Sequence, residues 1–424
     1  MPKKIYLGIH FCNFYIENTV LVYHNTFTMK RIFILLMCCL TGMALYAQSS
    51  ELDAWSQAYD GAQSVAEQLI YIQNVVDGNY AGAEDFYAKA LDKLILQYPN
   101  INTRSEWDAA DSVARILAVQ LGEARHTESA LNLWRMVGYF DNALVKAEAL
   151  VALGKIGDTA FLPQVVQILN DLNTQPQSDL TMRERSERIA YGAIISLENY
   201  KAPEGFLPVF FASTGWYSER IKNQASISLL NIMDDPTDQL LSVVTSSGYT
   251  YDVKYLALRT SERSNAADEH KANVAVAALA EGWKQQVSDV RLRQVLTQMR
   301  MLALNMIRRY KTQDASVYPQ LDRSYMNGDM DERLSVIYTL DSLSSEDSAR
   351  LLSGYLRTIH QRRTSGTLTT NDEQLVRVII PAMGNLGATG RALTRPVLLQ
   401  VQQSPDWTNV VKNLAADALK KIGN

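Results

Sequence analysis

The sequence predicts an all-α fold, specifically a right-handed α-solenoid of stacked antiparallel helix hairpins. Apolar residues recur at helical spacing along most of the chain, which is typical of amphipathic helices. An alanine followed four positions later by leucine or isoleucine recurs as well. No alternating pattern long enough for a sheet is present in the sequence.

The clearest stretch is 143–173, which predicts one helix, a turn and the start of the next hairpin. Gly154 and Gly157 come near the end of the first helix, where glycine permits a left-handed cap. Asp158 suits the N-cap of the following helix, and Pro163 is tolerated near that helix start. Apolar residues at helical spacing supply the two buried faces: Ala143, Ala147, Leu150, Val151 and Leu153, then Phe161, Leu162, Val165, Val166, Ile168 and Leu169.

The same step from a small to a large residue recurs along the chain, followed 10 to 12 positions later by a proline. The steps are Ala149 to Leu153, Ala193 to Leu197, Ala303 to Ile307 and Ala382 to Leu386, and the prolines are Pro163, Pro208, Pro319 and Pro396. Because a single hairpin leaves an apolar face exposed, neighbouring hairpins are expected to stack and cover it.

The segment A-E-A-L-V-A-L-G-K-I-G-D followed by F-L-P-Q-V-V-Q-I-L resembles HEAT repeats, particularly the short HEAT-like variety of phycobilisome lyases. The resemblance is clear at 143–173, fair at 186–247 and 376–423, and weak at 250–365. It implies a curved stack of helix pairs that binds proteins, sometimes as a subunit of an enzyme. No residue matches a chromophore site.

Residues 29–47 have the features of a secretory signal peptide, with a basic start, an apolar core and small residues before a cut after Ala47. Residues 1–28 are then an upstream artefact or extension. Two alternatives remain: a membrane anchor over 32–47, or a lipoprotein acylated at Cys38. All three cysteines precede the expected cut, so the mature chain would contain no disulfide or thiolate metal site.

After the signal we expect an atypical N-terminal helical cap over 48–140 and a HEAT-like repeat array over 141–424. Residues 253–263 are expected to be loosely structured, and 364–371 to form a flexible loop. Outside the stretch already described, helices are expected at 63–76, 81–97, 105–121, 126–139, 183–199, 205–213, 217–233, 237–246, 266–286, 289–310, 329–344, 346–362, 371–387, 390–403 and 406–422.

The sequence offers little for catalysis. A formal net charge of −4 argues against a general nucleic-acid binder. Only His126, His270 and His360 follow the signal, and the HExxH and GxSxG motifs are absent. The glycine-rich run 384–390 is better explained as a turn between helices than as a phosphate loop. We therefore assign no catalytic, cofactor-binding or metal-binding residue and expect no cofactor.

One group of basic residues stands out in an acidic chain and suggests a strip facing an acidic partner segment or lipid headgroups. The alternative is an ordinary solvated helix face. Under the first hypothesis, charge reversal at Arg300 and Arg308 weakens partner capture without lowering the melting temperature. The strip comprises Lys284, Arg291, Arg293, Arg300, Arg308, Arg309, Lys311, Arg357, Arg362 and Arg363.

Together these features favour an exported, non-enzymatic helical-repeat scaffold with an elongated surface for another protein or peptide, in the periplasm or outside a bacterial cell. The mature chain would have no membrane span and no nucleic-acid partner. Two alternatives stay open: an enzyme, or enzyme-associated domain, acting on envelope polymers, and a lipoprotein tethered to the membrane surface through Cys38.

Overall fold

The computed structural model describes residues 50–423 except 286 and 313. Every regular element within those residues is a helix, and none is a strand. The expected extension 1–28, the signal 29–47 and Cys38 lie outside the described residues. The described residues form two compact units, one of 50–165 with Gln177–Asn199, and one of Val166–Pro176 with 200–423.

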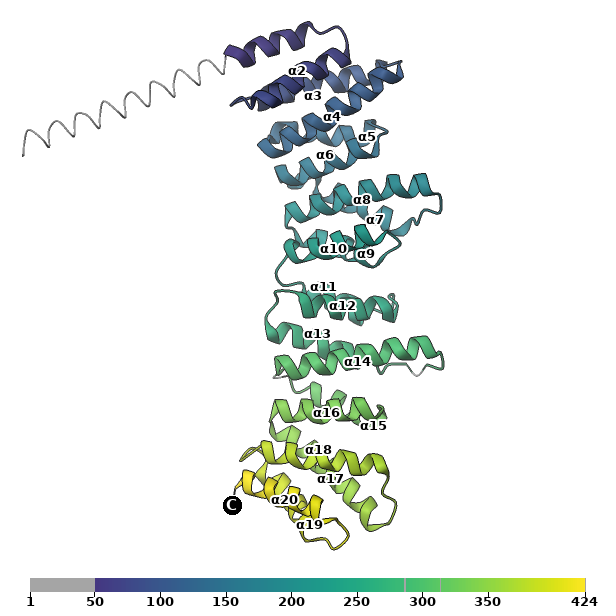
Figure 1. The fold of residues 1–424 in the computed structure, drawn as a ribbon, viewed down its shortest axis with the longest axis vertical. Coiled ribbons are helices and arrows are strands. Elements are labelled where there is room, and N and C mark those ends of the chain that lie inside the picture. Colours follow the sequence, from purple (N-terminus) through teal and green to yellow (C-terminus); the bar gives the residue numbers. More distant parts are fainter. Residues whose placement is uncertain (1–49, 286, 313, 424) are drawn as a thin grey trace, which may run out of the picture. The chain divides into compact units, whose positions relative to one another are not determined.

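In the first unit, each helix packs on the helix that follows it or on the next but one (Figure 1). Thus α4 contacts α2, α3 and α6, and α5 contacts α3 and α6. After a helix at 50–61, the elements are α2 (Val65–Gly78), α3 (Glu84–Gln97), η1 (Tyr98–Asn100), α4 (Arg104–Ala124), η2 (Thr127–Ser129), α5 (Ala130–Tyr139), α6 (Ala143–Ile156), η3 (Thr159–Phe161), the first residues of α7 (Leu162–Thr174), and α8 (Leu180–Tyr200) as far as residue 199.

The second unit continues the same sequential packing: α14 contacts α12, α13 and α16, and α17 contacts α15, α16, α18 and α19. It contains the rest of α7, then η4 (Pro203–Gly205), α9 (Phe206–Thr214), α10 (Glu219–Ile232), α11 (Thr237–Thr245), α12 (Tyr251–Arg263), α13 (Asp268–Glu281), α14 (Val290–Tyr310), α15 (Val317–Asn327), α16 (Met330–Leu343), α17 (Glu346–Thr364), α18 (Thr370–Asn385), α19 (Arg391–Gln403) and α20 (Asn409–Ile422). This sequential packing is consistent with a helical repeat.

The junction between α6 and α7 forms as its sequence predicts. The Asn142 side chain accepts a hydrogen bond from the Leu144 N–H and begins α6. Gly157 ends it in the left-handed conformation, with φ of 78°. Asp158 then caps the short helix η3 through the Ala160 N–H, and α7 follows directly.

Close helix contacts depend on small residues at the interfaces. Ala149 and Leu153 of α6 are fully buried, as are Ala193 and Leu197 of α8. The sequence suggests that Gly154 helps to end α6, but this glycine lies within the helix. A Cβ atom at Gly154 would come within 2.6 Å of the Ser196 backbone, so the two helices meet at this glycine.

Two helices of the second unit were not expected. Residues 251–263, whose larger part was predicted to be loose, form α12, and Val317–Asn327 forms α15. In both, a polar residue occupies a core position and interrupts the apolar pattern. Lys254 in α12 is 3% exposed, and Ser324 in α15 is fully buried. The glycine-rich run is a turn between α18 and α19, as predicted, with positive φ at Gly387 and Gly390.

Candidate functional site

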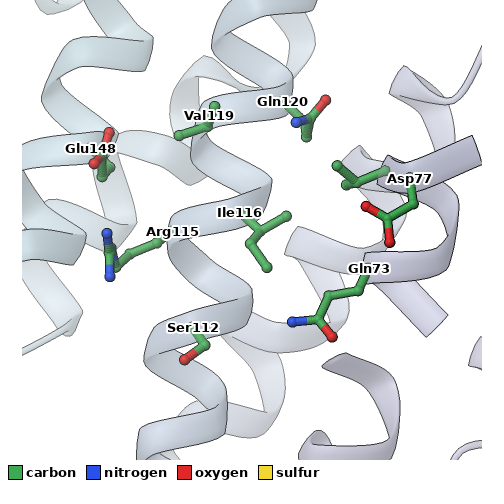
Figure 2. A pocket seen from close by; sticks show the side chains of 9 residues that line it. Gln73, Asp77, Ser112, Arg115, Ile116, Val119, Gln120 and Glu148 are labelled. Carbon is green, nitrogen blue, oxygen red and sulfur yellow. The ribbon is translucent and has the colours of Figure 1, made fainter. Parts of the chain in front are cut away.

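A hollow of about 350 Å³ lies on the surface that α2, α4 and α6 form together (Figure 2). Helical spacing places its residues on one face of each helix: positions 73, 76 and 77 on α2, and 112, 115, 116, 119 and 120 on α4. The lining residues are Gln73, Val76, Asp77, Ser112, Arg115, Ile116, Val119, Gln120 and Glu148.

The other face of α4 holds the hollow in place, because it is part of the core. Val113, Ala114, Leu117 and Ala118 are completely buried in the packing with neighbouring helices. Glu148 on α6 is set by the same packing, since Ala147 and Ala149 on either side of it are buried. The hollow therefore lies on a firmly packed support.

Charges of both signs surround an apolar centre in the hollow. Figure 2 shows Arg115 and Glu148 at one side, Gln73 and Asp77 at the other, and Ile116 between them. Within the part of the chain that the structure describes, Asp77, Arg115 and Glu148 form no ion pair with one another or with other residues.

Each of these groups can therefore pair with a group on a ligand. The Gln73 and Gln120 amides can both donate and accept hydrogen bonds, and the Ser112 hydroxyl donates to the Asp108 carbonyl at 2.9 Å. Amides, mixed charges and aliphatic side chains together suit a polypeptide segment, which presents backbone N–H and C=O groups with side chains of several kinds.

The sequence alone does not identify the hollow. Its only signal in the sequence is the helical spacing on α2 and α4, which exposed helix faces commonly show. What makes the hollow is the alignment of three helices, and this cannot be read from any one of them.

The predicted basic strip is distributed over several elements. Arg291, Arg293, Arg300, Arg308 and Arg309 belong to α14, and Lys311 is its left-handed C-cap. Lys284 precedes α14 and pairs with Glu281. Arg357, Arg362 and Arg363 belong to α17. The two helices share α16 as a neighbour but otherwise pack on different helices, α12 and α13 for α14, and α15, α18 and α19 for α17.

Arg300 does not belong to the surface strip that the sequence predicts, because its side chain lies in the core. It is 6% exposed, and its guanidinium group donates to the Glu332 carboxylate at 2.6 Å and to the Gly282 carbonyl at 3.0 Å. The ring of Trp283 lies 3.9 Å from the guanidinium carbon. Arg300 therefore stabilises the packing of α14 on α16 and is not available to a partner.

The other arginines of α14 are exposed but lie far apart. Arg291 and Arg293 are in the first turn, whereas Arg308 and Arg309 are in the last. At 1.5 Å per residue the two groups are about 24 Å apart along the helix. On α17, Arg362 pairs with Asp372 at 2.9 Å and Arg363 approaches Glu373 at 3.9 Å. Binding of an anionic partner along this strip stays a prediction.

The three histidines that follow the signal-like segment each have a local partner. His126 contacts the Ser129 hydroxyl, His270 contacts the Asp235 carboxylate, and His360 accepts a hydrogen bond from the Trp407 indole. The described residues contain no group of three His, Cys, Asp or Glu side chains placed to hold a metal ion. Among the helices of the described region, none combines the length and the apolar character needed to cross a membrane.

In comparisons with known proteins, the chain matches no family model, and no curated protein is significantly similar to it in sequence.

Proposed function

We propose that this protein is an exported, non-enzymatic scaffold that binds another protein through the hollow on α2, α4 and α6. The observation that carries the proposal is the set of unpaired charges around an apolar centre, presented by three neighbouring helices. Such a surface offers both an apolar contact and specific polar pairing to a polypeptide.

We propose further that the helices form a right-handed, HEAT-like α-solenoid. Sequential packing supports this reading, as do the close contacts at small residues, which recur between α4 and α6, α6 and α8, and α18 and α20. In a solenoid every second helix lines the same side, which would make the surface of α2, α4 and α6 continuous with further binding surface. The sequence of 29–47 supports export to the periplasm or beyond.

Site-specific photo-cross-linking in cells tests the proposal. A photo-reactive phenylalanine analogue replaces Gln120, which lines the hollow, or Leu131, which is 51% exposed on α5 and does not line it. We expect one discrete cross-linked partner from position 120 and none from position 131.

Adding Ile116→Glu to the chain that carries the analogue at position 120 provides the control within the site. A carboxylate in the apolar centre should abolish that product because it would be desolvated on binding. If both positions give the same products, or position 120 gives none, the hollow is not the binding surface.

A further inference from the structure

A small pocket of about 80 Å³ in the second unit is lined by residues of α15, α16, α17 and α18. Its apolar lining consists of Met326, Tyr355, Ile359 and Leu375. Its polar side carries Tyr325, Arg333, Arg362, Asp372 and Thr358. The volume is sufficient for a few water molecules, or for a carboxylate with a short alkyl stem.

The Tyr325 hydroxyl is the most unusual group in this cavity. Tyr325 is 7% exposed, and its ring stacks on that of Tyr355 at 3.6 Å between centroids. The Tyr355 hydroxyl donates to Asp322 at 3.0 Å, whereas the Tyr325 hydroxyl bonds to no residue that the structure describes. Burial raises the pKa of Tyr325 to about 12, so the hydroxyl keeps its proton at neutral pH and can donate a hydrogen bond.

Two guanidinium groups also keep unused donors. Arg333 donates through Nε to the Gly328 carbonyl at 3.1 Å and through one terminal nitrogen to the Met326 carbonyl at 3.4 Å. These bonds support the end of α15, and the other terminal nitrogen donates to no residue that the structure describes. Arg362 uses one terminal nitrogen for Asp372. A guanidinium group has five N–H donors, so both can bind a further acceptor.

The lining charges indicate which acceptor fits. Arg333 and Arg362 are positive and Asp372 is negative, which leaves one positive charge for a ligand to neutralise. A monoanion matches this charge, whereas a phosphate dianion would leave excess negative charge beside the Asp372 carboxylate. The apolar lining residues favour an anion carried on a short aliphatic stem.

We propose that this cavity binds a carboxylate group, held by the Tyr325 hydroxyl and the free guanidinium donors of Arg333 and Arg362. The source would be a small organic acid or an acidic or C-terminal group of a peptide. The site is independent of the hollow in the first unit, so either proposal can fail without the other.

Titration of the purified chain with sodium propionate tests this site. Saturation-transfer NMR measures propionate binding, and sodium chloride keeps the ionic strength constant. We expect saturable binding at millimolar concentrations and weaker binding of inorganic phosphate. Propionate that does not saturate, or phosphate that binds at least as tightly, overturns the proposal.

Variants then locate the binding. Tyr325→Phe keeps the ring stack but removes the hydroxyl, and Arg333→Gln removes the charge; each should raise the Kd for propionate at least fivefold. Tyr338→Phe is the matched control, because Tyr338 is exposed on α16 and does not line the cavity, and its Kd should be unchanged. Thermal unfolding identifies a variant that has lost its fold. Equal Kd values for Tyr325→Phe and the unsubstituted chain contradict the site even if Arg333→Gln unfolds.

Discussion

Two arginines of α14 have the same side chain and opposite surroundings. Arg300 is buried against Glu332, whereas Arg308 is exposed and, among the described residues, donates only to the Asn305 amide oxygen at 3.3 Å. The sequence pattern suggests one surface strip for both, because helical spacing does not reveal which side of a helix is covered. Arg300 therefore stabilises the packing of α14 on α16, whereas Arg308 remains at the surface.

Replacing Arg300 by leucine should lower the free energy of unfolding by about 3–5 kcal/mol, because it leaves the buried Glu332 carboxylate without its cation. Arg308→Leu on the same helix should change it by no more than about 0.5 kcal/mol. Urea denaturation measures both. Equal effects would show that Arg300 is not part of the core.

His270 and Asp235 form a pair whose strength depends on pH. The hydrogen bond with Asp235, reinforced by its negative charge, holds the pKa of His270 above its usual value of 6.5. Partial desolvation opposes ionisation of Asp235, but hydrogen bonds from Thr237 and His270 bring the net pKa of Asp235 below 3.8. The stabilisation by His270 is thus fully present below pH 6.5 and is lost as pH rises through its raised pKa. The contribution of Asp235 is lost as pH falls through its lowered pKa.

Asp235→Asn should therefore lower the pKa of His270 toward its usual value, as followed by NMR titration of the imidazole ring. Asp234→Asn is the matched control, since Asp234 is the exposed neighbour and forms no bond to His270. An unchanged His270 pKa in the Asp235 variant would contradict the pairing.

At the level of the helices, glycine and alanine at the contacts determine how closely neighbours pack. Gly154→Ala should reduce the free energy of unfolding by about 1–3 kcal/mol, because its Cβ would meet the Ser196 backbone of α8. Gly138→Ala on α5 should raise it by roughly 0.5–1 kcal/mol, because that glycine is exposed within a helix and has no atom within 4 Å of the added Cβ. Chemical denaturation of both variants checks the opposite signs. A loss of stability at Gly138, or none at Gly154, would contradict the close helix contact.

Helix positions were predictable where periodicity, caps and turns agree, as from Ala143 to Asp158. They were not predictable where a core position holds a polar group with its partner on another helix. Lys254 is such a case, because Glu281 on α13 lies 2.6 Å from its ammonium group. The hollow could not be predicted from the sequence for a related reason, since it depends on the alignment of α2 with α4 and α6.

For the molecule as a whole, the proposed export predicts which residue the processed chain begins with. We expect mass spectrometry of the purified protein from cells to give a chain that begins at Gln48, since the signal-like segment ends at Ala47. A diacylglycerol-modified chain that begins at Cys38 would support the tethered alternative. A chain that retains 29–47 would contradict processing.

We propose that the hollow of the first unit binds another protein, and the sharpest test of this binding is the affinity for the partner captured by cross-linking. Arg115→Glu reverses the only positive charge among the lining residues, and Arg135→Glu makes the same change at an exposed position on α5 that does not line the hollow. We expect Arg115→Glu to raise the Kd at least tenfold in isothermal titration calorimetry and Arg135→Glu to leave it within twofold. Equal Kd values for the two variants would contradict binding of the partner at the hollow.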